Sequence, residues 1–238
     1  MIFPKAIMDR PCGYVNLNLA AREWLREHNC LPEPPRILPG RPRKHPREPD
    51  KPNPLLDPET AMSMVWGFHH QCGLSWSYGG WLEARLDMHR GTYLEKDELW
   101  LHIGLDVNVL DQTEVRALAD GPILYVGDDS PLVGGWGGHV IQMITYRGNP
   151  HVLLYAHLGD IICKSGTTVS KGDVIGCVGT PQQNGYWFPH VHLQLFDWQY
   201  QQARDWQKFS DDMDGYTRLD NRVKWSHLCP DPTPLIFA

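Results

Sequence analysis

Short apolar segments separated by turns fill the middle of this 238-residue chain and limit what it can fold into. Between Glu98 and Asp197, runs rich in Val, Ile, Leu, Thr and Tyr alternate with Gly, Pro, Asn and Asp. This pattern is typical of β-strands joined by tight turns. It predicts strands at 99–103, 114–118, 123–126, 139–146, 151–157, 168–169, 174–178 and 191–196. We therefore predict a mainly β fold built on an antiparallel sheet, with a hairpin turning at 147–150.

The residues on either side differ from this segment in composition, so the sequence predicts three parts. Residues 1–98 form an N-terminal extension, residues 99–198 the β domain, and residues 199–238 a C-terminal tail. Both extensions are expected to be irregular. The tail is expected to dock through its apolar residues, which are Trp225, Leu235, Ile236 and Phe237.

The N-terminal extension itself contains three kinds of sequence. Residues 17–26 predict a short helix, with Asn16 or Asn18 as its N-cap. Residues 31–58 carry ten prolines, which leaves too few backbone donors for a helix or an interior strand. We expect this segment to lie extended on the protein surface without regular structure. Residues 59–98 hold a cluster of aromatic residues that is expected to pack against the flank of the β domain.

Composition argues against several classes of partner. The formal net charge of -6 and the isoelectric point near 6.0 give no support for a nucleic-acid partner. No apolar run reaches the length needed to span a membrane. The first residues lack the pattern of a secretory signal. We therefore expect a cytoplasmic protein as the chain is written, and a periplasmic or secreted one if the chain is a processed form.

Three short motifs contain the residues suited to metal binding and proton transfer: His102-Ile-Gly-Leu-Asp106, Tyr155-Ala-His157-Leu and His190-Val-His192-Leu. Residues i and i+2 of a strand point to the same face, so the last motif places two imidazoles side by side. One can bind a metal while the other reaches a water molecule bound to it, and the spacing alone does not decide which. His102 and Asp106, at the end of a strand and in the turn after it, can converge on the same ion.

Two histidines and a carboxylate with an open fourth position form the ligand set of a catalytic zinc site. The six cysteines contain no Cys-x-x-Cys pair, which disfavours a cysteine-based structural zinc site. Nitrogen and oxygen ligands without thiolate suit Zn²⁺, and Mn²⁺, Co²⁺ or Fe²⁺ stay open as alternatives. The chain has no His-Glu-x-x-His motif, so histidines rather than a glutamate have to transfer protons.

The region from about Trp100 to Phe196 resembles the lysostaphin/LytM-type zinc metalloendopeptidase family, whose signatures are His-x-x-x-Asp, Tyr-x-His-Leu and His-x-His. The resemblance implies that His102, Asp106 and His192 bind one Zn²⁺ ion. It also implies that His157 and His190 are the catalytic residues. The chain departs from the family at Gln194, where the family often has Glu.

The resemblance implies a hydrolase with a peptide substrate. The expected reaction is cleavage of an amide bond in a short peptide or one that contains Gly or D-amino acids, such as a peptidoglycan cross-link. Two alternatives stay open: an amidohydrolase-like activity on an intracellular peptide or metabolite, and a non-catalytic LytM-type module that regulates a partner. The sequence gives no oligomeric state.

Overall fold

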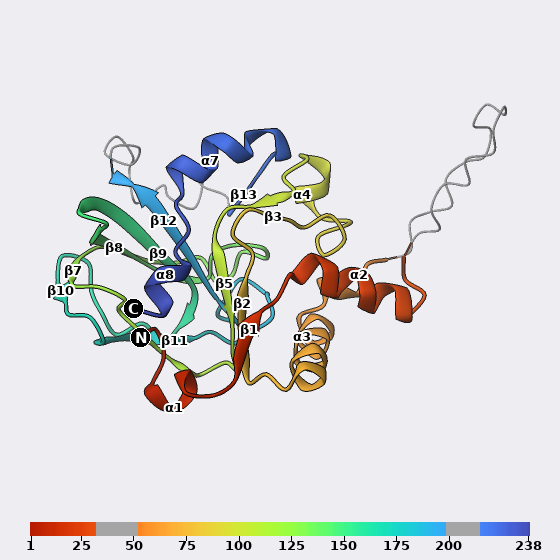
Figure 1. The fold of residues 1–238 in the computed structure, drawn as a ribbon, viewed down its shortest axis with the longest axis horizontal. Helices are drawn as coiled ribbons and strands as arrows, with labels where there is room; N and C mark the ends of the chain where they lie inside the picture. Colours follow the sequence, from red (N-terminus) through yellow and green to blue (C-terminus); the bar gives the residue numbers. More distant parts are fainter. Residues whose placement is uncertain (32–51, 199–214) are drawn as a thin grey trace.

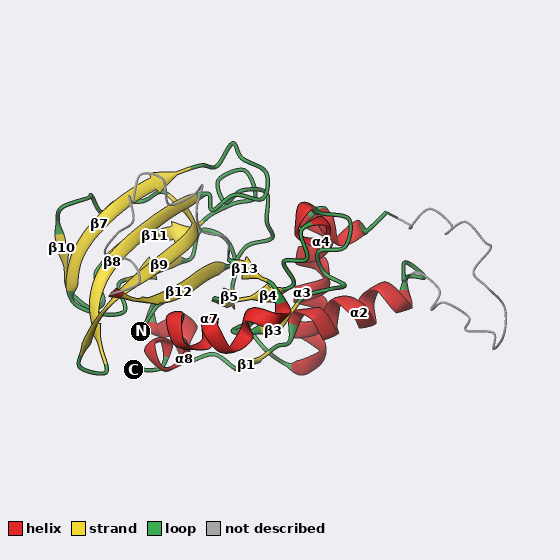
Figure 2. Ribbon diagram, turned by 90° about the horizontal axis from the view of Figure 1, so that it is seen from above, coloured by secondary structure: helices red, strands yellow, loops and turns green. Residues whose placement is uncertain are grey.

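The computed structural model describes residues 1–31, 52–198 and 215–238, and strands dominate these residues. Figures 1 and 2 show the long strands on one side of the molecule and helices α2, α3 and α4 on the other. Those helices span Leu17–Glu27, Pro58–Cys72 and Tyr93–Lys96. The predicted mainly β fold is confirmed. No helix among the described residues is long and apolar enough to cross a membrane.

The main sheet contains ten strands among the described residues. They are β1 (Cys12–Tyr14), β2 (Trp76–Gly79), β5 (Leu105–Asn108), β6 (Glu114–Arg116), β7 (Gly121–Asp128), β8 (Gly138–Tyr146), β9 (Asn149–Gly159), β10 (Thr168–Val169), β11 (Val174–Val178) and β12 (Val191–Asp197). Eight of them lie in the order β1-β2-β5-β12-β9-β8-β7-β10, while β11 pairs with β9 and β6. The first pair, β1 and β2, is parallel, and the other pairs are antiparallel.

A second, smaller sheet joins three short strands in the order β13-β4-β3. These strands are β3 (Glu83–Ala84), β4 (Leu101–His102) and β13 (Tyr216–Thr217). The remaining described helices are short: α1 (Lys5–Met8), the 3-10 turns η1 (Pro54–Leu56) and η3 (Leu219–Asn221), α7 (Arg222–Leu228) and α8 (Thr233–Ile236). Both extensions therefore contribute strands, so the sheets are not confined to residues 99–198.

Local sequence explains the best-defined elements. The predicted hairpin is formed by β8 and β9, which turn at Arg147 and Gly148 with φ values of 50° and 80°. Positive φ at both central residues is the geometry of a two-residue hairpin turn. Helix α2 begins after Asn16, whose side chain accepts a hydrogen bond from the Leu19 amide at 2.9 Å. The predicted helix and one of its two candidate caps are thus confirmed.

The Pro-rich segment is only partly described, and its described end contradicts the prediction. Residues 32–51 lie outside the described residues. Pro54–Leu56 forms a 3-10 turn and Pro58 begins the 15-residue helix α3. Proline is compatible with the first helical position because the N–H that it lacks has no partner there. The Asp57 side chain caps this helix by accepting a hydrogen bond from the Thr60 amide at 2.8 Å.

Strand β9 separates two buried apolar clusters. Leu153 and Tyr155 belong to one cluster, and Val152, Leu154 and Ala156 belong to the other. This alternation follows from the two-residue period of a strand. Because β9 is buried on both faces, it forms a rigid support for the residues at its end and for its neighbour β12.

The C-terminal residues dock as predicted. Leu235 and Ile236 of α8 are buried, and the Phe237 ring lies 5.1 Å from the Tyr78 ring, centroid to centroid. Trp225 packs against the second apolar cluster from α7, a helix that the sequence pattern did not predict. The polar residues 199–214 lie outside the described residues.

Candidate metal centre

Three of the predicted site residues converge at the junction of the two sheets. His102 ends β4, and Asp106 lies in β5 directly opposite His192 of β12. Asp106 is therefore in a strand, and its predicted place in a turn was wrong. The two residues between β4 and β5 carry the chain from the small sheet to the main sheet, so a strand-like run is divided in two. All three side chains are buried.

The atoms that face one another are His102 Nε2, Asp106 Oδ1 and His192 Nδ1. The two nitrogens lie 3.0 Å apart, and the carboxylate oxygen lies 3.4 Å from His102 Nε2 and 3.1 Å from His192 Nδ1. A tetrahedral zinc site with bonds of about 2.0–2.2 Å places its ligand atoms roughly 3.3 Å apart. The separations between these three atoms fit that requirement.

The outer nitrogens of both histidines face oxygen acceptors. His102 Nδ1 donates to the Gly80 carbonyl at 2.8 Å, and His192 Nε2 donates to Gln194 Oε1 at 2.9 Å. A neutral imidazole carries one proton, so the inner nitrogens present lone pairs. Burial, together with the Arg85 charge, lowers the pKa of His102 to about 4. Two imidazole nitrogens and a carboxylate oxygen thus meet at one point, which is a donor set for a cation.

Two glycines make room for this convergence. Gly80, with φ of 101°, lies so close to the His102 ring that an added Cβ would be 2.8 Å from Nδ1. A Cβ on Gly104, inside the first motif, would lie 2.3 Å from the His192 ring. Both contacts are shorter than side chains tolerate. Substitution at either position is therefore expected to displace a candidate ligand.

His157 and His190 lie beside the three candidate ligands with ring centroids 4.5 Å apart. Each donates its Nδ1 proton to a backbone carbonyl, His157 to Asn184 at 2.9 Å and His190 to Phe188 at 2.7 Å. Their Nε2 atoms are therefore left with lone pairs. His190 Nε2 is 3.7 Å from Asp106 Oδ1, farther than His192 Nδ1. Burial lowers the pKa of both imidazoles, which favours the neutral, proton-accepting form.

A β-bulge directs His157 into this site. Along the β8–β9 pair, Gly138 opposes Leu158 but Val140 opposes Tyr155, so β9 has one extra residue there. His157 has φ of 65°, and its amide donates to the Trp136 carbonyl at 2.8 Å. Left-handed backbone is unfavourable for a residue with a Cβ and is often found at functional sites. The sequence pattern predicted the strand but not this bulge.

A buried arginine holds the other oxygen of Asp106. Arg85 Nη1 lies 2.6 Å from Asp106 Oδ2, and Arg85 Nε donates to Glu83 Oε1 at 3.0 Å. All three side chains are at most 3% exposed. Burial by itself would raise the pKa of Asp106, but His102 and Arg85 hold it well below its usual range. The carboxylate is thus charged, with Oδ1 directed to the two histidines.

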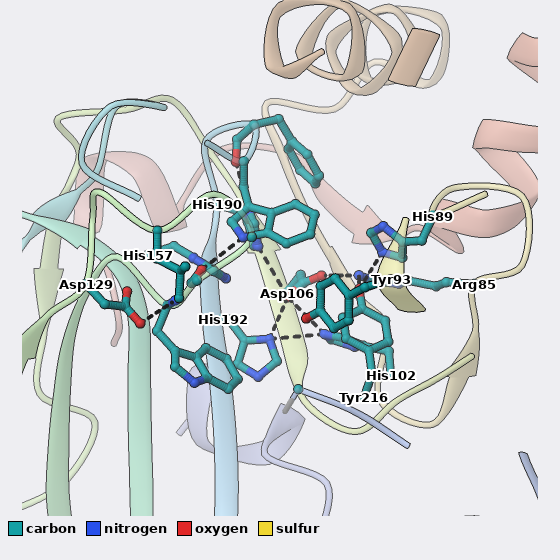
Figure 3. A pocket seen from close by; sticks show the side chains of 17 residues that line it. Arg85, His89, Tyr93, His102, Asp106, Asp129, His157, His190, His192 and Tyr216 are labelled. Carbon is teal, nitrogen blue, oxygen red and sulfur yellow. Dashed lines mark hydrogen bonds and ion pairs between the residues drawn. The ribbon is translucent and has the colours of Figure 1, made fainter. Parts of the chain in front are cut away.

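Residues outside the predicted β domain complete the pocket around these groups. The Tyr216 hydroxyl accepts a hydrogen bond from Arg85 Nη1 at 3.1 Å and lies 2.6 Å from His89 Nε2. Figure 3 shows Arg85 and His89 on the opposite side of Asp106 from His157 and His190. Tyr93, Trp136 and Trp187 also line this cavity of about 110 Å³. Sequence reasoning missed Arg85, His89 and Tyr216, which belong to no motif.

Three other histidines take structural positions. His69 of α3 is buried and hydrogen-bonded to the Ser77 hydroxyl at 2.7 Å. His139 and His151 lie in β8 and β9. Both are buried, with Nδ1 bonded to the carbonyls of Gly137 and Asn149. His102, Asp106 and His192 are the one group of metal-ligand type found among the described residues.

Comparison with known proteins identifies this part of the chain. Residues 101–205 match the model of Peptidase family M23. A DD-carboxypeptidase/endopeptidase, Mpg, of Neisseria meningitidis is 39% identical over 95 residues, which are 40% of this chain and 20% of that relative. The same protein of Neisseria gonorrhoeae matches to the same extent. This chain thus spans about a fifth of the length of these curated relatives.

Two solved structures are also similar. The catalytic domain of lysostaphin from Staphylococcus simulans is 23% identical, with a TM-score of 0.40, and the match covers 58% of this chain and 81% of that one. A zinc-containing peptidase from Vibrio cholerae is 22% identical, with a TM-score of 0.34, over 40% of this chain and 27% of that one. The match of residues 101–205 to the family M23 model confirms the resemblance that was seen in the motifs.

Proposed function

We propose that this chain is a zinc-dependent metallopeptidase that hydrolyses an amide bond in a short peptide or one that contains Gly or D-amino acids. Peptidoglycan cross-links are the proposed source of such bonds. The peptidase family match supports the reaction type. The observation that carries the metal dependence is the meeting of His102 Nε2, Asp106 Oδ1 and His192 Nδ1 within 3.4 Å of one another.

His102, Asp106 and His192 are the proposed ligands of one Zn²⁺ ion. When bound, the ion supplies Lewis acidity, which lowers the pKa of a water molecule from about 15.7 to about 7 and polarises a carbonyl. Arg85 occupies Asp106 Oδ2 and thereby leaves Oδ1 for the ligand set. Gln194 fixes the His192 ring by accepting its outer proton, as a neutral amide where a carboxylate is common in the family.

His157 and His190 are the proposed proton-transfer residues. Their Nδ1 protons are fixed on backbone carbonyls, so each Nε2 can accept a proton from the attacking water. The same nitrogens then protonate the departing amine and, while protonated, donate hydrogen bonds to the tetrahedral oxyanion. A non-catalytic regulatory module has no need of this full set. The presence of all five residues therefore supports the enzyme.

Metal analysis together with turnover tests the proposal. The purified chain, loaded with Zn²⁺ and freed of excess metal, should hold one zinc ion and release peptides from a cell-wall digest that mass spectrometry can identify. The Asp106→Ala, His192→Ala double variant should lose both properties.

The matched control is the Asp128→Ala, His227→Ala double variant, because both of those side chains are exposed. It should keep its zinc and its activity. Absence of stoichiometric zinc from the loaded wild-type chain, or full zinc occupancy in the Asp106→Ala, His192→Ala variant, would contradict the ligand assignment.

A further inference from the structure

A second cavity adjoins the candidate metal centre and differs from it in chemistry. Its volume is about 280 Å³, and it shares His89, Tyr93, Gly134, Trp187 and Phe188 with the first cavity. The described residues that line it include no Asp, Glu, Lys or Arg. The two cavities are therefore neighbours with one shared wall. The first is polar where the five motif residues meet, and the second is apolar.

The apolar part is built by two regions far apart in sequence. Leu56 of η1, Ala61 of α3 and Met88 come from the N-terminal residues, whereas Val133 and Tyr186 come from loops of the family M23 segment. Ala61 and Met88 are buried and form its inner part. Leu56, Val133 and Tyr186 are 43%, 73% and 45% exposed, and they leave apolar surface in contact with water.

The shared wall places this cavity beside the proposed proton-transfer residues. The Phe188 ring stacks on the His190 ring, with centroids 4.6 Å apart, and the Trp187 ring lies 6.1 Å from the His157 ring. Trp187 Nε1 donates to the Gly135 carbonyl at 3.0 Å, which joins the two loops. A peptide whose scissile bond lies at His157 and His190 would thus carry a nearby side chain to the apolar cavity.

We propose that this cavity binds an apolar side chain of the peptide substrate, aromatic or branched aliphatic, next to the scissile bond. The inference rests on the proposed peptidase function. Within its class of peptides that contain Gly or D-amino acids, it selects those with a large apolar side chain, which a cross-link built only of Gly and Ala lacks. An apolar cavity of about 150 Å³ holds benzene, so 280 Å³ accommodates a ring or a Leu side chain. A substrate made only of Gly and Ala has too little apolar surface to fill the cavity. It therefore gains no binding free energy there, because burial of apolar surface provides that free energy.

The test uses the full chain loaded with zinc and internally quenched peptides with the core Gly-Gly-X-Gly-Gly. X is Gly, Asp, Lys, Leu or Phe, and each residue other than Gly is used in L and D forms. For Leu or Phe in one configuration, kcat/KM should exceed the value for Gly about 10- to 100-fold, as expected for burial of one large apolar side chain. Asp and Lys should gain nothing.

Variants assign that preference to the cavity. Leu56→Asp and Val133→Asp introduce a charge from opposite walls, and each should bring the Phe-to-Gly ratio of kcat/KM close to one. Leu110→Asp is the matched control, because Leu110 is 59% exposed and lines neither cavity. It should keep the wild-type ratio. Similar rates for Gly, Asp and Phe peptides in the wild type, or a ratio unchanged in both cavity variants, would overturn the proposal.

Binding provides a readout that does not depend on hydrolysis. Calorimetry with the peptide acetyl-Gly-Phe-Gly-amide should show a negative heat-capacity change on binding to the wild-type chain, the mark of apolar burial. Leu56→Asp should weaken the binding of this Phe peptide about tenfold or more. The wild-type chain should bind acetyl-Gly-Gly-Gly-amide no more tightly than the Leu56→Asp variant binds the Phe peptide. If no peptide is hydrolysed but this binding pattern is found, the proposed peptidase function is refuted and the proposed binding site for an apolar side chain stands. Equal binding of both peptides would refute the cavity.

Discussion

The family M23 segment and the residues that flank it contribute differently to the same pocket. All five motif histidine and aspartate residues lie within 101–205, whereas Arg85, His89, Tyr93 and Tyr216 come from outside it. The first group presents four imidazoles and a carboxylate, four of them on strands of two sheets and His190 directly before β12. The second group closes the cavity around them, and two of its members, His89 and Tyr93, form one side of the apolar cavity together with η1 and α3. The difference suggests that the segment sets the reaction and the flanks set what reaches it.

The largest effect expected from this comparison is on turnover. His157→Ala and His190→Ala should each keep zinc but lower kcat by about 10²–10⁴-fold, the usual contribution of general acid–base catalysis. His89→Ala removes a pocket histidine from the flanking region and should cost less. Because burial lowers the pKa of His157 and His190, the acid limb of the pH–rate profile should lie below their ordinary value of about 6.5.

Zinc content and kcat, measured on the same preparations, check these expectations. Loss of zinc in either single variant would reassign that histidine as a ligand. A His89→Ala defect as large as the other two would remove the distinction between the segment and its flanks.

Arg85 tests the distinction between the segment and its flanks most directly, because it is a flanking residue that contacts a candidate metal ligand, Asp106. Arg85→Met leaves Glu83 and Asp106 as buried charges without their common partner. Breaking a buried ion pair in this way costs about 3–5 kcal/mol. Zinc should offset part of the loss by compensating the Asp106 charge, so denaturant unfolding should show a larger loss in the metal-free chain.

Arg218→Met is the matched control, because its pair with Glu98 is 49% and 61% exposed. Exposed pairs contribute about 0–1 kcal/mol. Equal destabilisation by the two variants would mean that Arg85 does not hold Asp106 in place.

A smaller effect, on the order of 2 kcal/mol, concerns how the flanking helix α3 stays attached at acid pH. Burial lowers the pKa of His69 to about 4, against about 6.5 when unfolded. Between pH 6.5 and 4, His69 is therefore protonated in the unfolded chain but not in the folded chain. The folded chain keeps this part of its free energy of unfolding above pH 6.5 and loses it as the pH falls toward 4. Thermal unfolding at pH 7 and 4.5 should show a smaller decrease in Tm for His69→Gln than for the wild type.

The other buried histidines lower Tm at acid pH in the wild type and the variant alike. The difference between the two decreases in Tm therefore reports on His69 alone. An identical decrease in the variant would show that His69 protonates without cost in the folded chain. The coupling of α3 to Ser77 of β2 would then not depend on pH.

The part of the site that sequence could predict is the part set by strand periodicity. His190 and His192 lie two residues apart, so a shared face follows from the pleat, and the strand pairing then places His192 opposite Asp106. The β10 and β11 ranges were predicted to the residue because turns with Gly bound them. The part that depends on chain path was not predictable. Nothing in the spacing of Arg85, His89 and Tyr216 shows that two segments so far apart in sequence meet.

The division of 102–106 between two sheets has the same cause. Apolar residues continue through Ile103 and Leu105, so the pattern reads as one strand ending near the first ligand. The structure instead changes sheets there, and the change follows from partners that the local pattern does not contain: β3 and β13 on one side, β2 and β12 on the other. The predicted three-part division of the chain stays a prediction, although β1 and β2 join the main sheet from its first part.

The bulge at His157 has a consequence for how this chain changes over generations. At φ of 65° a Gly residue fits the backbone better than His, by on the order of 1 kcal/mol. Burial of the imidazole and its hydrogen bond to the Asn184 carbonyl favour histidine in the present fold, so backbone strain alone does not decide the residue. A descendant that no longer needs hydrolysis is under no selection for the chemistry of this imidazole and can replace it. The identity of residue 157 is then a marker of whether a copy of this domain is still under selection as an enzyme.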